Sequence, residues 1–60
     1  MSKAEIKRDI DTKLETIQLN WHELATKPHT PAERRQVRAS IEAHIAELPG
    51  LLAAYEDADA

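Results

Sequence analysis

Two prolines near the middle of the chain, Pro28 and Pro31, divide it into halves that each have the pattern of one helix. A proline has no N–H to donate and restricts the residue before it, so it ends a preceding helix. Thr30 directly precedes Pro31, and Glu33 follows three residues after Thr30, which is the pattern of a helix start with a capping box. We therefore expect a turn over residues 27–30 between two helices.

The first half carries a helical stripe of large apolar residues behind a serine that fits an N-cap. Ser2 is followed three residues later by Glu5, which predicts another capping box. Apolar side chains then recur every three or four residues, the period of an α-helix. They are Ile6, Ile10, Leu14, Ile17, Trp21 and Leu24. We expect a helix over about residues 3–26, with this stripe turned toward the second helix.

The second half repeats the same spacing but contains a proline. Its apolar residues are Val37, Ile41, Ile45, Leu48, Leu52 and Tyr55. Pro49-Gly50 falls inside the stripe, and an interior proline kinks or breaks a helix. Either the helix kinks there and continues, or a short third helix begins at Pro49. We expect a helix over about residues 31–56, kinked or broken at this point, and a frayed acidic tail over 57–60, because acids are unfavourable at a helix C-terminus.

These elements predict an all-α fold, an antiparallel helical hairpin that forms a single domain over residues 1–60. A short connection makes consecutive helices antiparallel neighbours. The chain has 60 residues and no cysteine, and only 15 of its apolar residues are larger than alanine. So small a core is marginal on its own. We expect the hairpin to form a homodimer, a four-helix bundle, or to bind another protein.

Size and composition exclude several classes of protein. No run of residues approaches the roughly 18 apolar residues of a membrane span. The N-terminus leads into a charged segment and not into the apolar core of a signal peptide. A chain this short can hardly build the deep pocket of an enzyme, and no catalytic pair stands out. We expect a small cytoplasmic protein of bacterial or phage origin, with no catalytic residues and no cofactor.

Three apolar residues are candidates for contact with a partner. Trp21 is the only tryptophan and lies on the stripe near the turn, where it either closes the end of the bundle or anchors a partner. Leu19 lies two residues from Ile17 and from Trp21, so it should point away from the hairpin seam. Leu51, beside Pro49-Gly50, is also off the strict stripe. Both leucines are either ordinary exposed residues or intermolecular contacts.

A basic patch and a histidine are the polar candidates. Arg34, Arg35 and Arg38 are concentrated at the start of the second helix. They form either a salt-bridged face, with Glu23 or Glu42 as counter-charge, or a surface for a protein or for phosphate. His44 flanks the second stripe and is either structural or pH-sensitive. We expect no metal site, because one hairpin cannot easily gather its three histidines.

Two functions follow as alternatives. The first is a non-enzymatic protein–protein interaction module, an adaptor, inhibitor or regulator that acts as an oligomeric helical bundle. The second is a nucleic-acid-binding regulator that uses the arginine patch, although the net charge of −3 opposes it. In length, two-helix outline and acidic tail, the chain is similar to the Rop-like plasmid hairpins, which dimerise into four-helix bundles and bind RNA. No motif is shared, so no residue carries over from that resemblance.

Overall fold

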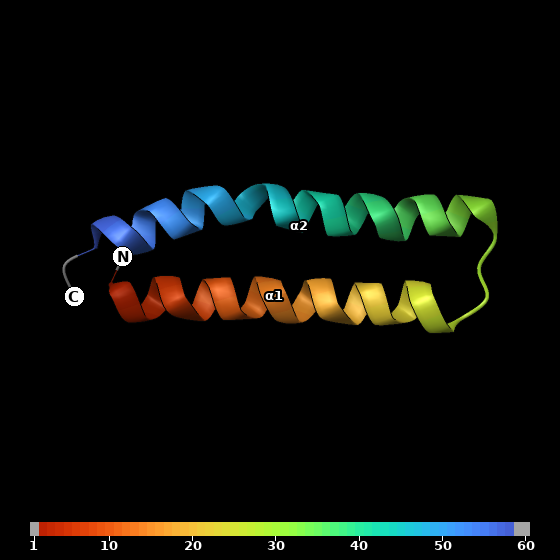
Figure 1. The fold of residues 1–60 in the computed structure, drawn as a ribbon, viewed down its shortest axis with the longest axis horizontal. Coiled ribbons are helices and arrows are strands. Elements are labelled where there is room, and N and C mark those ends of the chain that lie inside the picture. The colour runs from red at the N-terminus through yellow and green to blue at the C-terminus, as the bar shows by residue number, and fades with distance from the viewer. Residues whose placement is uncertain (1, 59–60) are drawn as a thin grey trace.

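The computed structural model describes residues 2–58 and shows two antiparallel helices packed side by side (Figure 1). Helix α1 spans Lys3–Thr26 and helix α2 spans Pro31–Asp57. The described chain is a thin rod with extents of 46 × 16 × 12 Å. The predicted all-helical hairpin is therefore confirmed, with the turn at the expected place.

Both helices begin with a cap made by the predicted residues. Thr30 Oγ1 accepts a hydrogen bond from the Glu33 N–H at 3.2 Å, and Glu33 Oε1 accepts one from the Thr30 N–H at 2.8 Å. The bonds from Thr30 hold the pKa of the Glu33 carboxyl below its usual value, because they favour the charged form. At α1, Ser2 Oγ accepts from the Glu5 N–H. The Glu5 carboxylate bonds the Ser2 hydroxyl at 3.1 Å, whereas we expected it to reach the backbone N–H.

The turn is tied to both helices by side chains. The Lys27 N–H donates to the Glu23 carbonyl at 3.1 Å, which ends α1. The His29 ring is nearly buried, and its Nδ1 lies 2.7 Å from the Lys27 carbonyl oxygen. Arg34 Nη1 donates to the His29 carbonyl at 2.8 Å. The bonds from the His29 ring and from Arg34 occupy the carbonyls of Lys27 and His29, which lie between the two helices.

Three contacts between the helices set their register. Lys3 lies over the Tyr55 ring, with Nζ 4.7 Å from the ring centre. Lys13 forms an ion pair with Glu47. Asn20 Nδ2 donates to Ser40 Oγ at 3.0 Å. These contacts are spread along the hairpin and share one antiparallel alignment.

We call the contact between α1 and α2 the seam. It combines apolar and polar side chains at alternating steps of three and four residues, the spacing of a two-helix coiled coil. Its buried or half-buried apolar residues are Ile6, Ile10, Ile17, Leu24, Val37, Ile41, Leu48, Leu51 and Tyr55. Lys13, Asn20 and His44 occupy seam positions between them. Among residues 2–58, Ile6 alone is buried, with 4% of its surface exposed.

The expectation that the whole apolar stripe faces the second helix was wrong. Four stripe residues remain about half exposed: Leu14 at 47%, Trp21 at 61%, Ile45 at 49% and Leu52 at 54%. Two packed helices bury only the residues that point directly at each other. The stripe is wider than that, so part of it lies outside the seam.

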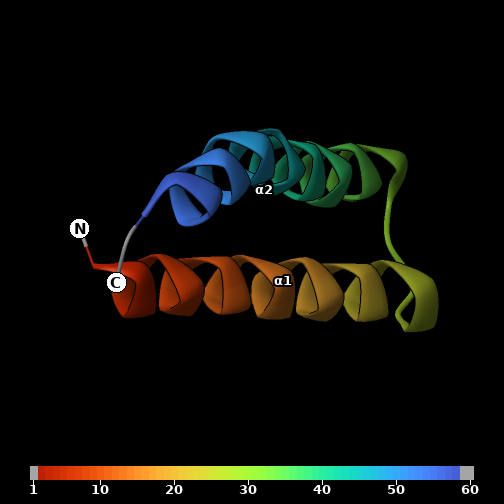
Figure 2. The ribbon, with the colours of Figure 1, turned by 60° about the vertical axis from the view of Figure 1, so that its left-hand side comes forward.

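Helix α2 continues through Pro49 and Gly50 without a break. Pro49 cannot donate a hydrogen bond to the carbonyl four residues earlier, and this loss bends a helix. Accordingly α2 is bowed whereas α1 is nearly straight (Figure 2). The helix ends at Asp57, and the Ala58 N–H donates to the Tyr55 carbonyl. The predicted frayed tail remains a prediction, since residues 59–60 lie outside the described residues.

Candidate interaction surfaces

The four exposed stripe residues lie on one side of the hairpin. Leu14 and Trp21 each directly follow a seam residue in α1, and Ile45 and Leu52 each directly follow one in α2. In an antiparallel helix pair, residues that directly follow equivalent seam positions on the two helices flank the seam on the same side. We call these four residues the apolar face.

The register of the hairpin orders the apolar face along its length. The Lys13–Glu47 and Asn20–Ser40 contacts place Leu14 level with Ile45, in the middle of the hairpin. By the same alignment, Leu52 is level with Lys7 and Trp21 is level with Arg38. The face therefore has a wholly apolar centre, and each end pairs one apolar with one basic residue.

Both basic residues at the ends of the face are already neutralised. Lys7 Nζ lies 2.7 Å from Asp11 Oδ2, and this hydrogen bond and charge raise the pKa of Lys7 above its ordinary value. Arg38 Nε lies 3.2 Å from Glu42 Oε1, which is one of the two counter-charges that the sequence left open. Because each cation has a carboxylate one turn away on its own helix, the face carries little net charge.

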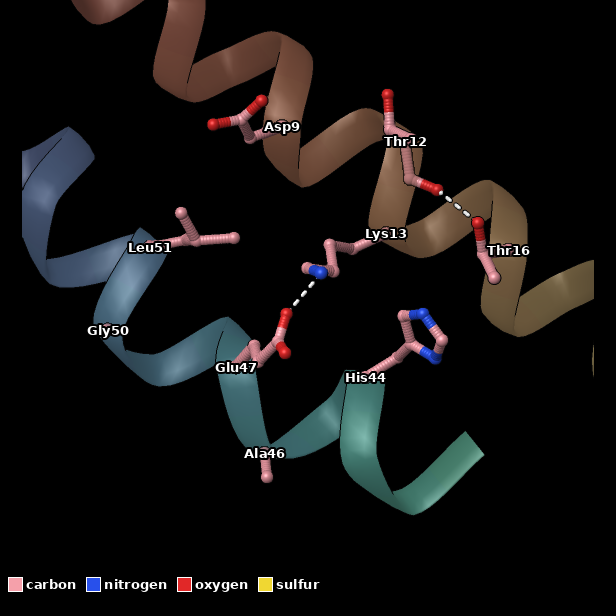
Figure 3. A pocket seen from close by; sticks show the side chains of 9 residues that line it. All are labelled: Asp9, Thr12, Lys13, Thr16, His44, Ala46, Glu47, Gly50 and Leu51. Atoms are coloured by element: carbon pink, nitrogen blue, oxygen red, sulfur yellow. Dashed lines mark hydrogen bonds and ion pairs between the residues drawn. The ribbon is translucent and has the colours of Figure 1, made fainter. Parts of the chain in front are cut away.

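A groove lined by both polar and apolar side chains runs along the other side of the seam (Figure 3). It has a volume of about 710 Å³, and small residues such as Ala46 and Gly50 leave it open. The Lys13–Glu47 ion pair crosses it. The bond and charge of Lys13 hold the pKa of the Glu47 carboxyl below its ordinary value. The groove is thus bridged by an ion pair and shaped by small side chains.

The half-buried His44 ring lines this groove, with Nδ1 2.7 Å from the Ser40 carbonyl oxygen. A neutral ring held in this way donates from Nδ1, so Nε2 is its acceptor nitrogen and takes no part in this bond. No three His, Asp or Glu side chains among residues 2–58 are grouped to bind a metal. That His44 is pH-sensitive remains a prediction.

The predicted basic patch is exposed, and two of its three arginines already have partners. Arg34, Arg35 and Arg38 surround a small depression of about 280 Å³ together with Pro31. Arg34 bonds the His29 carbonyl and Arg38 pairs with Glu42. Internal partners occupy part of the donor capacity that a phosphate would use.

The structure does not bring the three predicted apolar contacts together. Trp21 lies on the apolar face, whereas Leu19 is 64% exposed on the side of α1 away from the seam, as expected. Leu51 was expected off the stripe, but it lies in the seam and lines the groove that the Lys13–Glu47 pair crosses. Sequence reasoning missed Leu14, Ile45 and Leu52 as surface residues. The signal was present in the width of the stripe, which exceeds what one helix neighbour can cover.

Comparison with known proteins gives no relative for this chain. No protein-family model matches it, and neither a curated protein nor a solved structure does. Within the described part of the chain, neither helix has the length and apolar character needed to cross a membrane. Proposals about function therefore depend on the surfaces themselves.

Proposed function

We propose that this chain is a protein–protein interaction module, an adaptor, inhibitor or regulator that acts as an oligomeric helical bundle, in its simplest form a homodimer. The observation that supports it is the apolar face, four large side chains aligned on one side of a hairpin in which Ile6 alone, of residues 2–58, is buried. Single exposed apolar residues are ordinary, but residues gathered on one face mark a site of association.

The apolar face suits a helical partner surface better than a small ligand. It extends along both helices and has no enclosing wall. Trp21 is half exposed at one end, and tryptophan is enriched among residues that dominate binding energy. The paired charges at Lys7–Asp11 and Arg38–Glu42 would form a polar rim around an apolar centre, which is the usual layout of a protein interface.

A tagged pull-down of the full chain from a lysate of its source cells tests the proposal. We expect a stoichiometric protein that stays bound after nuclease treatment and is lost with Leu14→Asp. Leu19→Asp is the matched control, since Leu19 is an exposed leucine on the same helix but off the apolar face. If Leu14→Asp captures the same proteins as the wild type, the apolar face is not the binding surface.

A second candidate, a Rop-like nucleic-acid-binding regulator, is favoured by the depression that Pro31 forms with Arg34, Arg35 and Arg38. Binding to phosphates releases counterions, so its affinity falls steeply as salt is raised. The test is a titration with a labelled RNA hairpin at several salt concentrations, for the wild type and for Arg35→Glu. Binding that weakens with salt and is lost in the variant would favour this candidate over the first.

A further inference from the structure

We infer that the first partner of the apolar face is a second copy of this chain, which docks by its own apolar face. This inference rests on the proposed function and names one occupant for its surface. It commits to a two-fold symmetric, face-to-face pair of hairpins. It also places Leu14 and Ile45 of both copies in one central layer.

The exposed area of one hairpin sets how much surface a compact pair would bury. The chain exposes 4636 Å², whereas a compact protein of 6.8 kDa exposes roughly 3,950 Å². A compact protein of twice the mass exposes roughly 6,600 Å². Pairing two hairpins into a compact body would therefore bury about 2,700 Å² in total. Obligate homodimers bury about 2,000–5,000 Å², so a compact pair of these hairpins falls within that range.

The face is also complementary to itself. In a two-fold pair the same patch must serve on both copies, so a face with a strong net charge would repel its own copy. Here the middle of the face is apolar, with Leu14 level with Ile45, and the cations at its ends are paired with carboxylates on their own helices. The whole chain has a net charge of −3, so this near-neutral strip is a favourable place for two copies to meet.

The spacing of the apolar residues fits a four-helix core. Helices in such bundles bury a stripe that is wider than a two-helix seam, because each helix contacts two neighbours. Ile10, Ile17, Ile41 and Leu48 are half-buried in the seam and border the apolar face. A second hairpin laid on this face would cover them together with the four exposed residues.

Molecular mass in solution is the first test. By light scattering or sedimentation, we expect the wild-type chain to have twice the mass of 6.8 kDa. Leu14→Asp should reduce it to one chain or abolish folding, whereas Leu19→Asp should remain a dimer. A wild type that stays monomeric overturns the inference, and so does a Leu14→Asp variant that remains a dimer.

Single cysteines give an answer even if Leu14→Asp does not fold, since the chain has no cysteine of its own. Disulfides form only between nearby residues. If the turns of the two copies lie at opposite ends, Leu14→Cys should oxidise to a dimer. If the turns lie at the same end, a mixture of Leu14→Cys and Ile45→Cys should form the mixed disulfide. Either result supports the inference, with Leu19→Cys as the control that should not cross-link. Failure of all these pairs to cross-link overturns it.

The outcomes separate this inference from the proposed function. A monomeric wild type that still captures a cellular protein through the apolar face would retain the interaction module and remove self-pairing. A dimer that captures no protein would retain self-pairing and remove the adaptor role. A monomer that captures nothing would remove both.

Discussion

At the scale of single residues, the seam is notable for its polar members. Lys13, Asn20 and His44 occupy positions that an apolar residue would fill in a stronger core, and each has a partner. A polar group at such a position costs stability unless it is hydrogen-bonded, but it favours one register over others. The seam therefore defines the alignment of the two helices better than it stabilises their contact.

The Lys13–Glu47 pair predicts a pH dependence of stability. The pKa of Glu47 is lowered from its ordinary 4.5 by Lys13. Its contribution to stability is therefore present above pH 4.5 and is lost as the pH falls through the lower, folded-state pKa. We expect Glu47→Gln to lower Tm at neutral pH and to reduce the drop in Tm on acidification.

Thermal unfolding followed by circular dichroism at neutral and acidic pH measures this effect. Glu15→Gln, on the outer side of α1, is the control and should retain the acid dependence of the wild type. Glu33, whose pKa is lowered by Thr30, contributes acid sensitivity of the same sign in all three proteins. If Glu47→Gln and the wild type lose the same Tm on acidification, the ion pair makes no contribution in solution.

At the scale of the helices, features that depend on nearby residues could be predicted from the sequence. The path of α2 past Pro49 could not. The caps at Ser2 and Thr30 depend on residues within one turn, so the sequence locates both helix starts. Pro49 disfavours a helix locally, yet Leu48 and Leu51 on either side of it pack in the seam. Packing of this kind can outweigh an unfavourable residue, which is why the sequence left a kink and a break open as alternatives.

Gly50 offers a direct test of how α2 is stabilised at this point. It has no positive φ, and a Cβ added there meets nothing within 4 Å. We expect Gly50→Ala to raise the free energy of unfolding by about 1 kcal/mol, because alanine loses less backbone entropy than glycine in a helix. Urea denaturation measures it. Ala46→Gly, one turn earlier in the same groove, should lower stability by a similar amount. A destabilising Gly50→Ala would mean that α2 is not a continuous helix here.

At the scale of the whole molecule, the sequence predicts the hairpin but not how its apolar stripe is divided. The stripe contains residues that face α1 or α2 and residues that face outward, and both kinds are large and apolar. The neighbours that decide the matter, Lys13, Asn20 and His44, are polar, so a search for apolar periodicity overlooks them. Leu51 was misplaced for the same reason, because the equivalent seam position seven residues earlier is occupied by the polar His44.

Trp21 reports on the whole assembly because it is the only tryptophan. In one hairpin 61% of its surface is exposed, and pairing through the apolar face would cover it. Dimerisation is favoured by mass action, so dilution should separate the copies and return Trp21 to water. We expect fluorescence emission to shift to longer wavelength, and quenching by iodide to increase, as the wild-type protein is diluted. Leu14→Asp should show the diluted values at every concentration, while Leu19→Asp should follow the wild type. An emission spectrum that stays the same while dilution lowers the mass from two chains to one would place the contact between copies away from Trp21.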